Sequence, residues 1–141
     1  MTTTISDHAV NVAVQLAAAG IGLTRGTNLY NGPMRAQDAE GVPSEAVFCH
    51  VTGGVPPIDY CDNSHTPQLH QPSVQIMIRS APRGYDAGLA LANDVYEAMH
   101  SKPPSGYFGC LAQQSAPLYA GETRNGEFLW TVNLTLYLDE T

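Results

Sequence analysis

A run of alternating apolar and polar side chains near the end of the chain constrains the fold more than any other feature. It follows the turn dipeptide Asn125-Gly126, and its apolar members are Phe128, Trp130, Val132, Leu134, Leu136 and Leu138. A period of two places these side chains on one face of a β-strand. The Asn-Gly pair tolerates positive φ and predicts a type I′ hairpin turn before the strand. A strand of this length with one apolar face is expected to lie centrally in a sheet and to pack against helices.

Two segments carry the three- and four-residue spacing that is typical of amphipathic helices. The first begins at Ser6-Asp7, where side-chain oxygens can cap a helix, and ends at Gly20. Its predicted buried face contains Val10, Ala13, Val14, Ala17 and Ile21. The second helix is predicted from Tyr85 to His100, and its stripe contains Leu89, Ala92, Val95, Tyr96 and Met99.

Further strands are predicted where β-forming residues cluster. They cover residues 46–51, 73–79, 107–112 and 117–121, with a brief extended piece at Leu29-Tyr30. Gly53-Gly54 is expected to end the strand at 46–51. Residues 53–73 contain four prolines and no sustained period, so we expect a long loop there. Loops longer than about 12–15 residues are uncommon in compact domains and are often functional.

Length and composition predict one soluble domain that covers residues 1–141. The chain is 43% apolar, which suffices for one core. No stretch approaches the roughly 18 apolar residues of a membrane span, and the first residues lack the pattern of a signal peptide, so synthesis in a cytoplasm is expected. Six basic residues against 13 acidic ones give a net charge of −7, which argues against nucleic-acid binding. Only 13% of residues are charged, a hint that neighbours cover part of the surface.

The cysteines and histidines between residues 49 and 70 raise the possibility of a metal site. Structural zinc sites usually contain cysteine pairs two to four residues apart, whereas Cys49 and Cys61 are far apart. The weak metal candidates are Cys61, His65 and His70. We favour a buried thiol at Cys49 and loop histidines, with no metal and no cofactor.

Motifs of nucleophilic catalysis are not found. The chain has no Gly-x-Ser-x-Gly elbow, no local cysteine–histidine signature and no paired carboxylate motif. Gly53-Gly54 and Gly20-Ile-Gly22 precede neither a P-loop lysine nor a dinucleotide fingerprint. The sequence therefore predicts a protein that is not an enzyme, and a small Cys/His metal protein or hydrolase stays a remote alternative.

The order of elements in the second half resembles a known family. An apolar strand ends in Arg79, a helix covers 85–100, and an Arg124-Asn-Gly126 turn precedes Phe128-Leu-Trp-Thr-Val-Asn133. This pattern is similar to the minor capsid proteins of tailed bacteriophages that act as tail terminators, the tail-completion ring proteins of siphophages. Asn31-Gly-Pro33 and the strand at 46–51 fit the same layout, so the resemblance extends from Ser6 to Leu138. The Pro- and His-rich stretch from Val55 to Gln71 is longer than the family pattern implies.

The resemblance implies an α+β fold in which a twisted, mainly antiparallel or mixed sheet carries two helices on one face. It implies a ring, typically a hexamer, that caps the tail tube, stops its polymerisation and docks head-completion proteins. Such a protein is located in the tail or neck of the virion, is assembled in the host cytoplasm, contacts no membrane and lets DNA pass through the lumen without binding it. Catalytic residues and cofactors are not required. The candidates for subunit or partner contacts are Pro56, Pro57, Tyr60, His65, Arg79, Arg124 and Asn125.

One structural alternative remains open from the sequence. Another head–tail connector, or a neck or tail-tube component, would share the acidic composition, the many loops and the lack of catalytic motifs. Only stoichiometry and position in the particle would distinguish it from a terminator.

Overall fold

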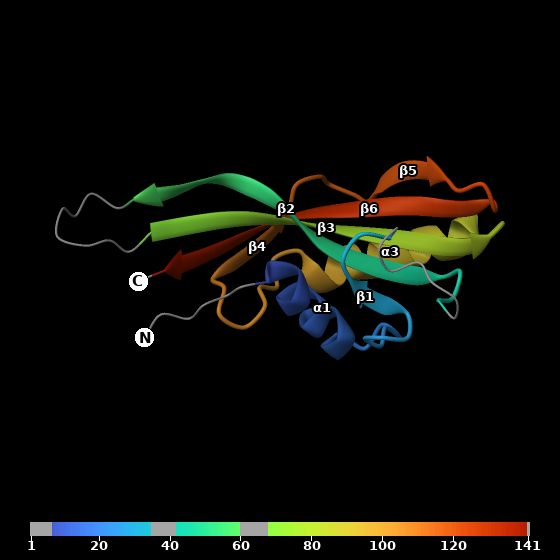
Figure 1. Ribbon diagram of the computed structural model, residues 1–141, viewed down its shortest axis with the longest axis horizontal. Coiled ribbons are helices and arrows are strands. Elements are labelled where there is room, and N and C mark those ends of the chain that lie inside the picture. Colours follow the sequence, from blue (N-terminus) through green and yellow to red (C-terminus); the bar gives the residue numbers. More distant parts are fainter. Residues whose placement is uncertain (1–6, 35–41, 60–67, 141) are drawn as a thin grey trace.

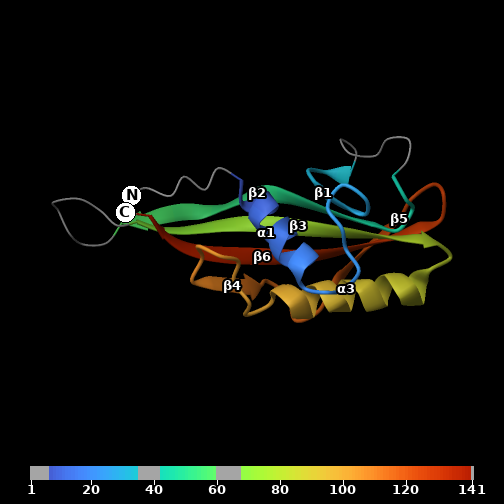
Figure 2. The same ribbon diagram turned by 90° about the horizontal axis from the view of Figure 1, so that it is seen from below.

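The computed structural model describes residues 7–34, 42–59 and 68–140, which form a single α+β domain. An open six-stranded sheet packs against two helices that share one hydrophobic core on one of its faces (Figure 1, Figure 2). The predicted fold class is therefore confirmed. Within the described ranges, no helix is long and apolar enough to cross a membrane.

The sheet has the strand order β1-β2-β3-β6-β4, and β5 pairs with β6 beside β4. Only the β1–β2 pair is parallel. The strands are β1 (Leu29–Asn31), β2 (Ala46–Asp59), β3 (Gln68–Pro82), β4 (Gly109–Ala112), β5 (Leu118–Glu122) and β6 (Glu127–Glu140). Strand β6 lies between β3 on one side and β4 and β5 on the other, so its predicted central position is confirmed.

The core lies between the helices and the alternating apolar face of β6. Phe128 is half-buried, while the other five residues of the predicted face are buried, namely Trp130, Val132, Leu134, Leu136 and Leu138. They share the core with Val74, Ile76 and Ile78 of β3. Because each fully buried side chain of this size contributes about 1.5–3 kcal/mol, β3 and β6 supply much of the apolar burial that stabilises the domain.

Helix α1 (His8–Ala18) begins at the predicted place but buries a different face. Its N-cap is Asp7, whose Oδ1 accepts hydrogen bonds from the backbone N–H groups of Ala9 at 3.0 Å and Val10 at 3.2 Å. Ser6 lies outside the described residues. The buried residues are Ala9, Val12, Ala13 and Leu16, whereas Val14 and Ala17 of the predicted face are exposed. Alanines and valines satisfy helical spacing in more than one phase, and the sheet selects the phase that buries Leu16.

Helix α3 (Tyr85–Met99) confirms the second predicted helix and lies very close to the sheet. The close approach occurs at Gly88, where an added Cβ would lie 2.7 Å from Cβ of Ser80 and 3.0 Å from Nε1 of Trp130. Any side chain at residue 88 would therefore push the helix off the sheet. The helix buries Gly88, Ala92, Val95, Ala98 and Met99.

The predicted long loop at residues 53–73 is wrong, because most of it forms a β-hairpin. Strand β2 continues to Asp59 and β3 begins at Gln68, while residues 60–67 lie outside the described residues. Register shifts between Val51 and Gly53 and between Val55 and Ile58 are β-bulges, and they leave Thr52 and the pair Pro56-Pro57 without partners in the register of β3. Gly54 has φ +120° and pairs with Pro72, and a Cβ there would clash with the carbonyl oxygen of Gln71. The glycines that we expected to end the strand therefore lie inside it, paired with β3 directly after a bulge.

The predicted type I′ turn before β6 is also wrong. The N–H of Gly126 donates to the carbonyl oxygen of Thr123 at 3.0 Å, and Gly126 has φ +80°, whereas Asn125 is not among the described residues with positive φ. The N–H of Thr123 in turn donates to the carbonyl oxygen of Glu127 at 2.8 Å. This is a three-residue hairpin loop in which the positive-φ residue is Gly126 alone.

Candidate interaction surfaces

Arg79 is buried and engages its own chain. The residue is 3% exposed, and its guanidinium donates from Nε to the carbonyl oxygen of Ser44 and from Nη2 to that of Pro43, both at 2.8 Å. Its Nε lies 3.5 Å from Oε2 of Glu127, and its Cζ lies 5.3 Å from the ring centroid of Phe48. The expectation that Arg79 contacts a neighbouring subunit is therefore corrected, because its donors are directed at internal partners.

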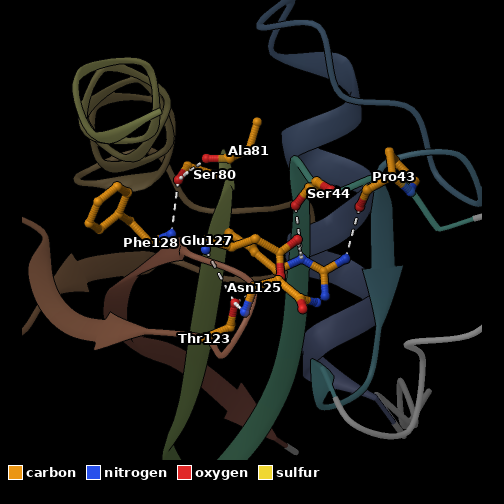
Figure 3. Close-up of polar contacts among 9 residues, drawn as sticks. Pro43, Ser44, Ser80, Ala81, Thr123, Asn125, Glu127 and Phe128 are labelled. Atoms are coloured by element: carbon orange, nitrogen blue, oxygen red, sulfur yellow. Dashed lines mark hydrogen bonds and ion pairs between the residues drawn. The ribbon is translucent and has the colours of Figure 1, made fainter. Parts of the chain in front are cut away.

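The contacts around Glu127 fix the β5–β6 turn to the body of the domain (Figure 3). The hydroxyl of Thr123 donates to Oε1 of Glu127 at 2.9 Å, and the N–H of Phe128 donates to Oγ of Ser80 on β3 at 3.1 Å. Arg124 and Asn125 are exposed at the tip of this turn. These two predicted contact residues are therefore exposed to solvent on a turn that hydrogen bonds hold against β3.

The structure describes some of the other predicted contact and metal candidates, and the rest lie outside the described residues. Pro56 and Pro57 are exposed in the second half of β2. His70 is half-buried in β3. The remaining candidates, Tyr60, Cys61 and His65, lie outside the described residues. In the ranges that the structure describes, no three His, Cys, Asp or Glu side chains are grouped so that they could hold a metal ion.

Cys49 and Cys110 are buried free thiols, as predicted for Cys49. Burial raises the pKa of each thiol to about 12, because the apolar surroundings disfavour the charged thiolate. The thiolate is the form that attacks electrophiles and binds metals. Neither cysteine is therefore suited to nucleophilic chemistry.

The sheet face opposite the helices carries a belt of uncharged hydrogen-bonding side chains. Gln75 Nε2 donates to Oδ1 of Asn133 at 3.1 Å, and Asn133 Nδ2 donates to Oε1 of Gln114 at 3.3 Å. Gln113 Nε2 lies 3.3 Å from Oγ of Ser73 and 3.2 Å from Oγ1 of Thr135. Asn133 therefore both accepts and donates a hydrogen bond on this face. An open hollow on this face is lined by Thr52, Gly54, Val55, Gln71, Ser73, Gln113, Thr135 and Tyr137.

Exposed apolar side chains gather on the strands at both edges of the sheet. On β2, Val51, Val55 and Ile58 are exposed by 42% to 57%. At the opposite edge, Leu118 and Tyr119 of β5 are 43% and 51% exposed, and Leu111 of β4 and the preceding Phe108 are also exposed. Sequence reasoning missed these residues, although a signal was available. Residues 46–58 and 103–121 contain no Asp, Glu, Lys or Arg, and such charge-depleted segments are typical of the central part of protein interfaces.

Comparisons with known proteins agree with the resemblance stated above. A family model described as bacteriophage tail terminator protein matches residues 16–140. Among solved structures, a chain from the virion of a native gene transfer agent particle is similar over 94% of this chain and 95% of that chain, with a TM-score of 0.60 and 15% sequence identity. At that identity the likeness shows the fold alone. No significant match was found among curated protein sequences.

Proposed function

The chain belongs to the bacteriophage tail terminator family, and from this premise we propose that it forms a closed ring on the end of the tail tube, stops tube polymerisation and joins the tail to head-completion proteins. Membership makes it a structural protein of the virion. The observation that carries the proposal is the extent of the family match. It begins near the end of α1 and runs to the end of β6, so it includes the whole sheet and all of α3.

The distribution of exposed apolar residues supports a ring. A closed ring uses head-to-tail contacts, in which each subunit offers two different surfaces. The uncharged surface along β2 and the uncharged surface along β5 lie at opposite edges of the sheet. Copies that each carry a net charge of −7 repel one another, so a contact free of charged side chains is the favourable way to join them. We propose a homohexamer, as the family resemblance implies.

The electrostatics support passage of DNA through the ring without specific binding. The net negative charge of each copy repels the DNA backbone, and the chain has only six Lys and Arg residues with which to neutralise phosphates. The proposed partners are therefore further copies of the chain, the tube protein and a head-completion protein. We propose a purely structural role without catalysis or cofactor, as membership of the tail terminator family implies.

A tube-growth reaction tests this proposal. Purified tube protein is allowed to polymerise with and without this protein, and tube lengths and ends are imaged by electron microscopy. We expect shorter tubes with a cap at one end and no decoration along their sides. Decoration along the whole tube would instead indicate another neck or tube component. Tubes of unchanged length with bare ends would refute termination.

A further inference from the structure

We propose that neighbouring copies in the ring join by β-strand pairing, in which the open edge of β2 from Val51 to Ile58 of one copy pairs antiparallel with β5 of the next copy. The inference rests on the proposed ring and specifies which edges form its subunit contact. The partner is a second copy of this chain.

The first step is that the outer edge of β2 is open over most of its length. Strand β1 pairs with β2 only from Val47 to Cys49, and no other described strand lies on that side. From Val51 to Ile58 every residue is exposed and none is charged. Figure 1 shows that this part of the sheet projects beyond both helices. An exposed, apolar strand edge with unpaired N–H and C=O groups is a template for another strand, and natural proteins usually cover, charge or interrupt such an edge. Pro56 and Pro57 have no N–H, so the backbone donors that could reach a neighbouring strand come mainly from Val51 to Val55.

The second step is that two of the other edges are closed by local hydrogen bonds. On β1, the N–H of Gly26 donates to the carbonyl oxygen of Leu29 at 2.9 Å. On β4, the N–H of Ser101 donates to the carbonyl oxygen of Cys110 at 2.7 Å, and the N–H of Ala112 donates to Nδ1 of His100 at 3.0 Å. Neither strand therefore offers a free ladder of backbone groups.

Strand β5 is the matching open edge on the opposite side of the sheet. It pairs with β6 on one side, and no described strand pairs with its other side. Its residues from Leu118 to Gly121 are uncharged, with Leu118 and Tyr119 exposed. The sheet thus has one open edge on each side among the described strands, which is what a head-to-tail contact requires.

Strand direction and level fit this pairing. Strands β2 and β6 both run antiparallel to β3, and β5 runs antiparallel to β6, so β5 of a neighbour in the same orientation meets β2 antiparallel. Strand β5 lies level with the part of β2 that β1 already covers, since Trp130 pairs with both Tyr119 and Ile78, and Ile78 pairs with Val47. The neighbour must therefore be displaced along the strands to reach Val51–Ile58. A stagger of this kind accompanies tilted strands when a sheet closes on itself.

Cross-linking between two variants that each carry one engineered, exposed cysteine tests the pairing, since Cys49 and Cys110 are buried. Val55 and Leu118 both lie on the sheet face opposite the helices, so V55C and L118C, each in a C61S background, are mixed and treated with a short bismaleimide. We expect cross-linked pairs only in the mixture. The matched control replaces V55C with V14C, because Val14 is 48% exposed but lies on α1. Its mixture with L118C should stay uncross-linked.

A second pair of variants and a mass measurement separate this inference from the proposed ring. V55K places a charge on the open edge and should shift the mass in light scattering from ring to monomer, whereas V14K should leave the ring intact, and both should keep the wild-type circular dichroism spectrum. A ring that forms normally with V55K, or without V55C–L118C cross-links, would overturn the edge pairing and leave the ring standing. If the wild-type chain forms no ring in solution or on tubes, the proposed function and this inference both fail.

Discussion

Replacing Arg79 with methionine should destabilise the domain more than any other single change of a charged residue among those described. Arg79 is 3% exposed and the side chain of Glu127 is 8% exposed, so the carboxylate would remain buried without its cationic partner. Removal of one member of a buried ion pair costs about 3–5 kcal/mol. The carbonyl oxygens of Pro43 and Ser44 would also lose their donors, but both residues are exposed and water can replace the guanidinium. We therefore expect a loss of about 4 kcal/mol in the free energy of unfolding.

Urea denaturation measures this loss directly. With an m value of about 2 kcal/mol/M, the midpoint should fall by about 2 M. Arg124→Met is the matched control, since Arg124 is exposed at the turn tip and its loss should cost less than about 0.5 kcal/mol. Adding Glu127→Gln to Arg79→Met removes the unpaired buried carboxylate and should recover part of the lost free energy of unfolding. A midpoint within about 0.5 M of the wild type for Arg79→Met, or strictly additive effects in the double variant, would refute a buried pair.

Four further outcomes follow from the structure. Trp130→Ala should cost about 3–5 kcal/mol and prevent stable folding, so a soluble variant with a wild-type urea midpoint would mean that the core face is misassigned. Gly88→Ala should cost about 1–3 kcal/mol in thermal unfolding, because its Cβ would press on Ser80, and an unchanged Tm would contradict the close approach of α3. Cys49 and Cys110 should not react with a thiol reagent at pH 8 until the chain unfolds. Prompt labelling of the native protein would show that the thiols are not buried. Burial raises the pKa of both thiols from 9.0 to about 12, so the protonated thiols should stabilise the fold fully below pH 9, and this stabilisation should be lost between pH 9 and about 12. Ring formation measured by light scattering should strengthen as ionic strength rises from about 0.01 to 0.15 M, because salt screens repulsion between copies of charge −7, and dissociation with salt would instead indicate ion pairs across the interface.

The parts of the fold that could be predicted from the sequence are those with a strong local period. The alternation from Trp130 to Leu138 indicated a strand with one buried face, and its length and apolar content favoured a central position in the sheet. The stripe of α3 similarly identified a helix that the structure places at Tyr85–Met99. In α1, the small residues left the phase of the helix ambiguous, and packing of Leu16 against the sheet decided it.

The parts that could not be predicted depend on contacts between distant segments. The glycine and proline pairs of β2 were interpreted as breakers, because a β-bulge is visible only when the partner strand β3 is known. Arg79 and Glu127 are far apart in the sequence, so no local pattern indicated that they form a buried pair. The interaction surfaces could have been found in part, because the charge-free stretches at 46–58 and 103–121 are visible in the sequence, but only the sheet topology shows that they lie on opposite sides.

Electron microscopy of isolated tail tubes incubated with the purified protein tests the central claim most directly. The account predicts a closed ring at one end of each tube, and tubes capped in this way should not elongate when tube protein is added. Bare tube ends, or capped tubes that continue to grow at the capped end, would contradict the claim that this chain terminates the tail.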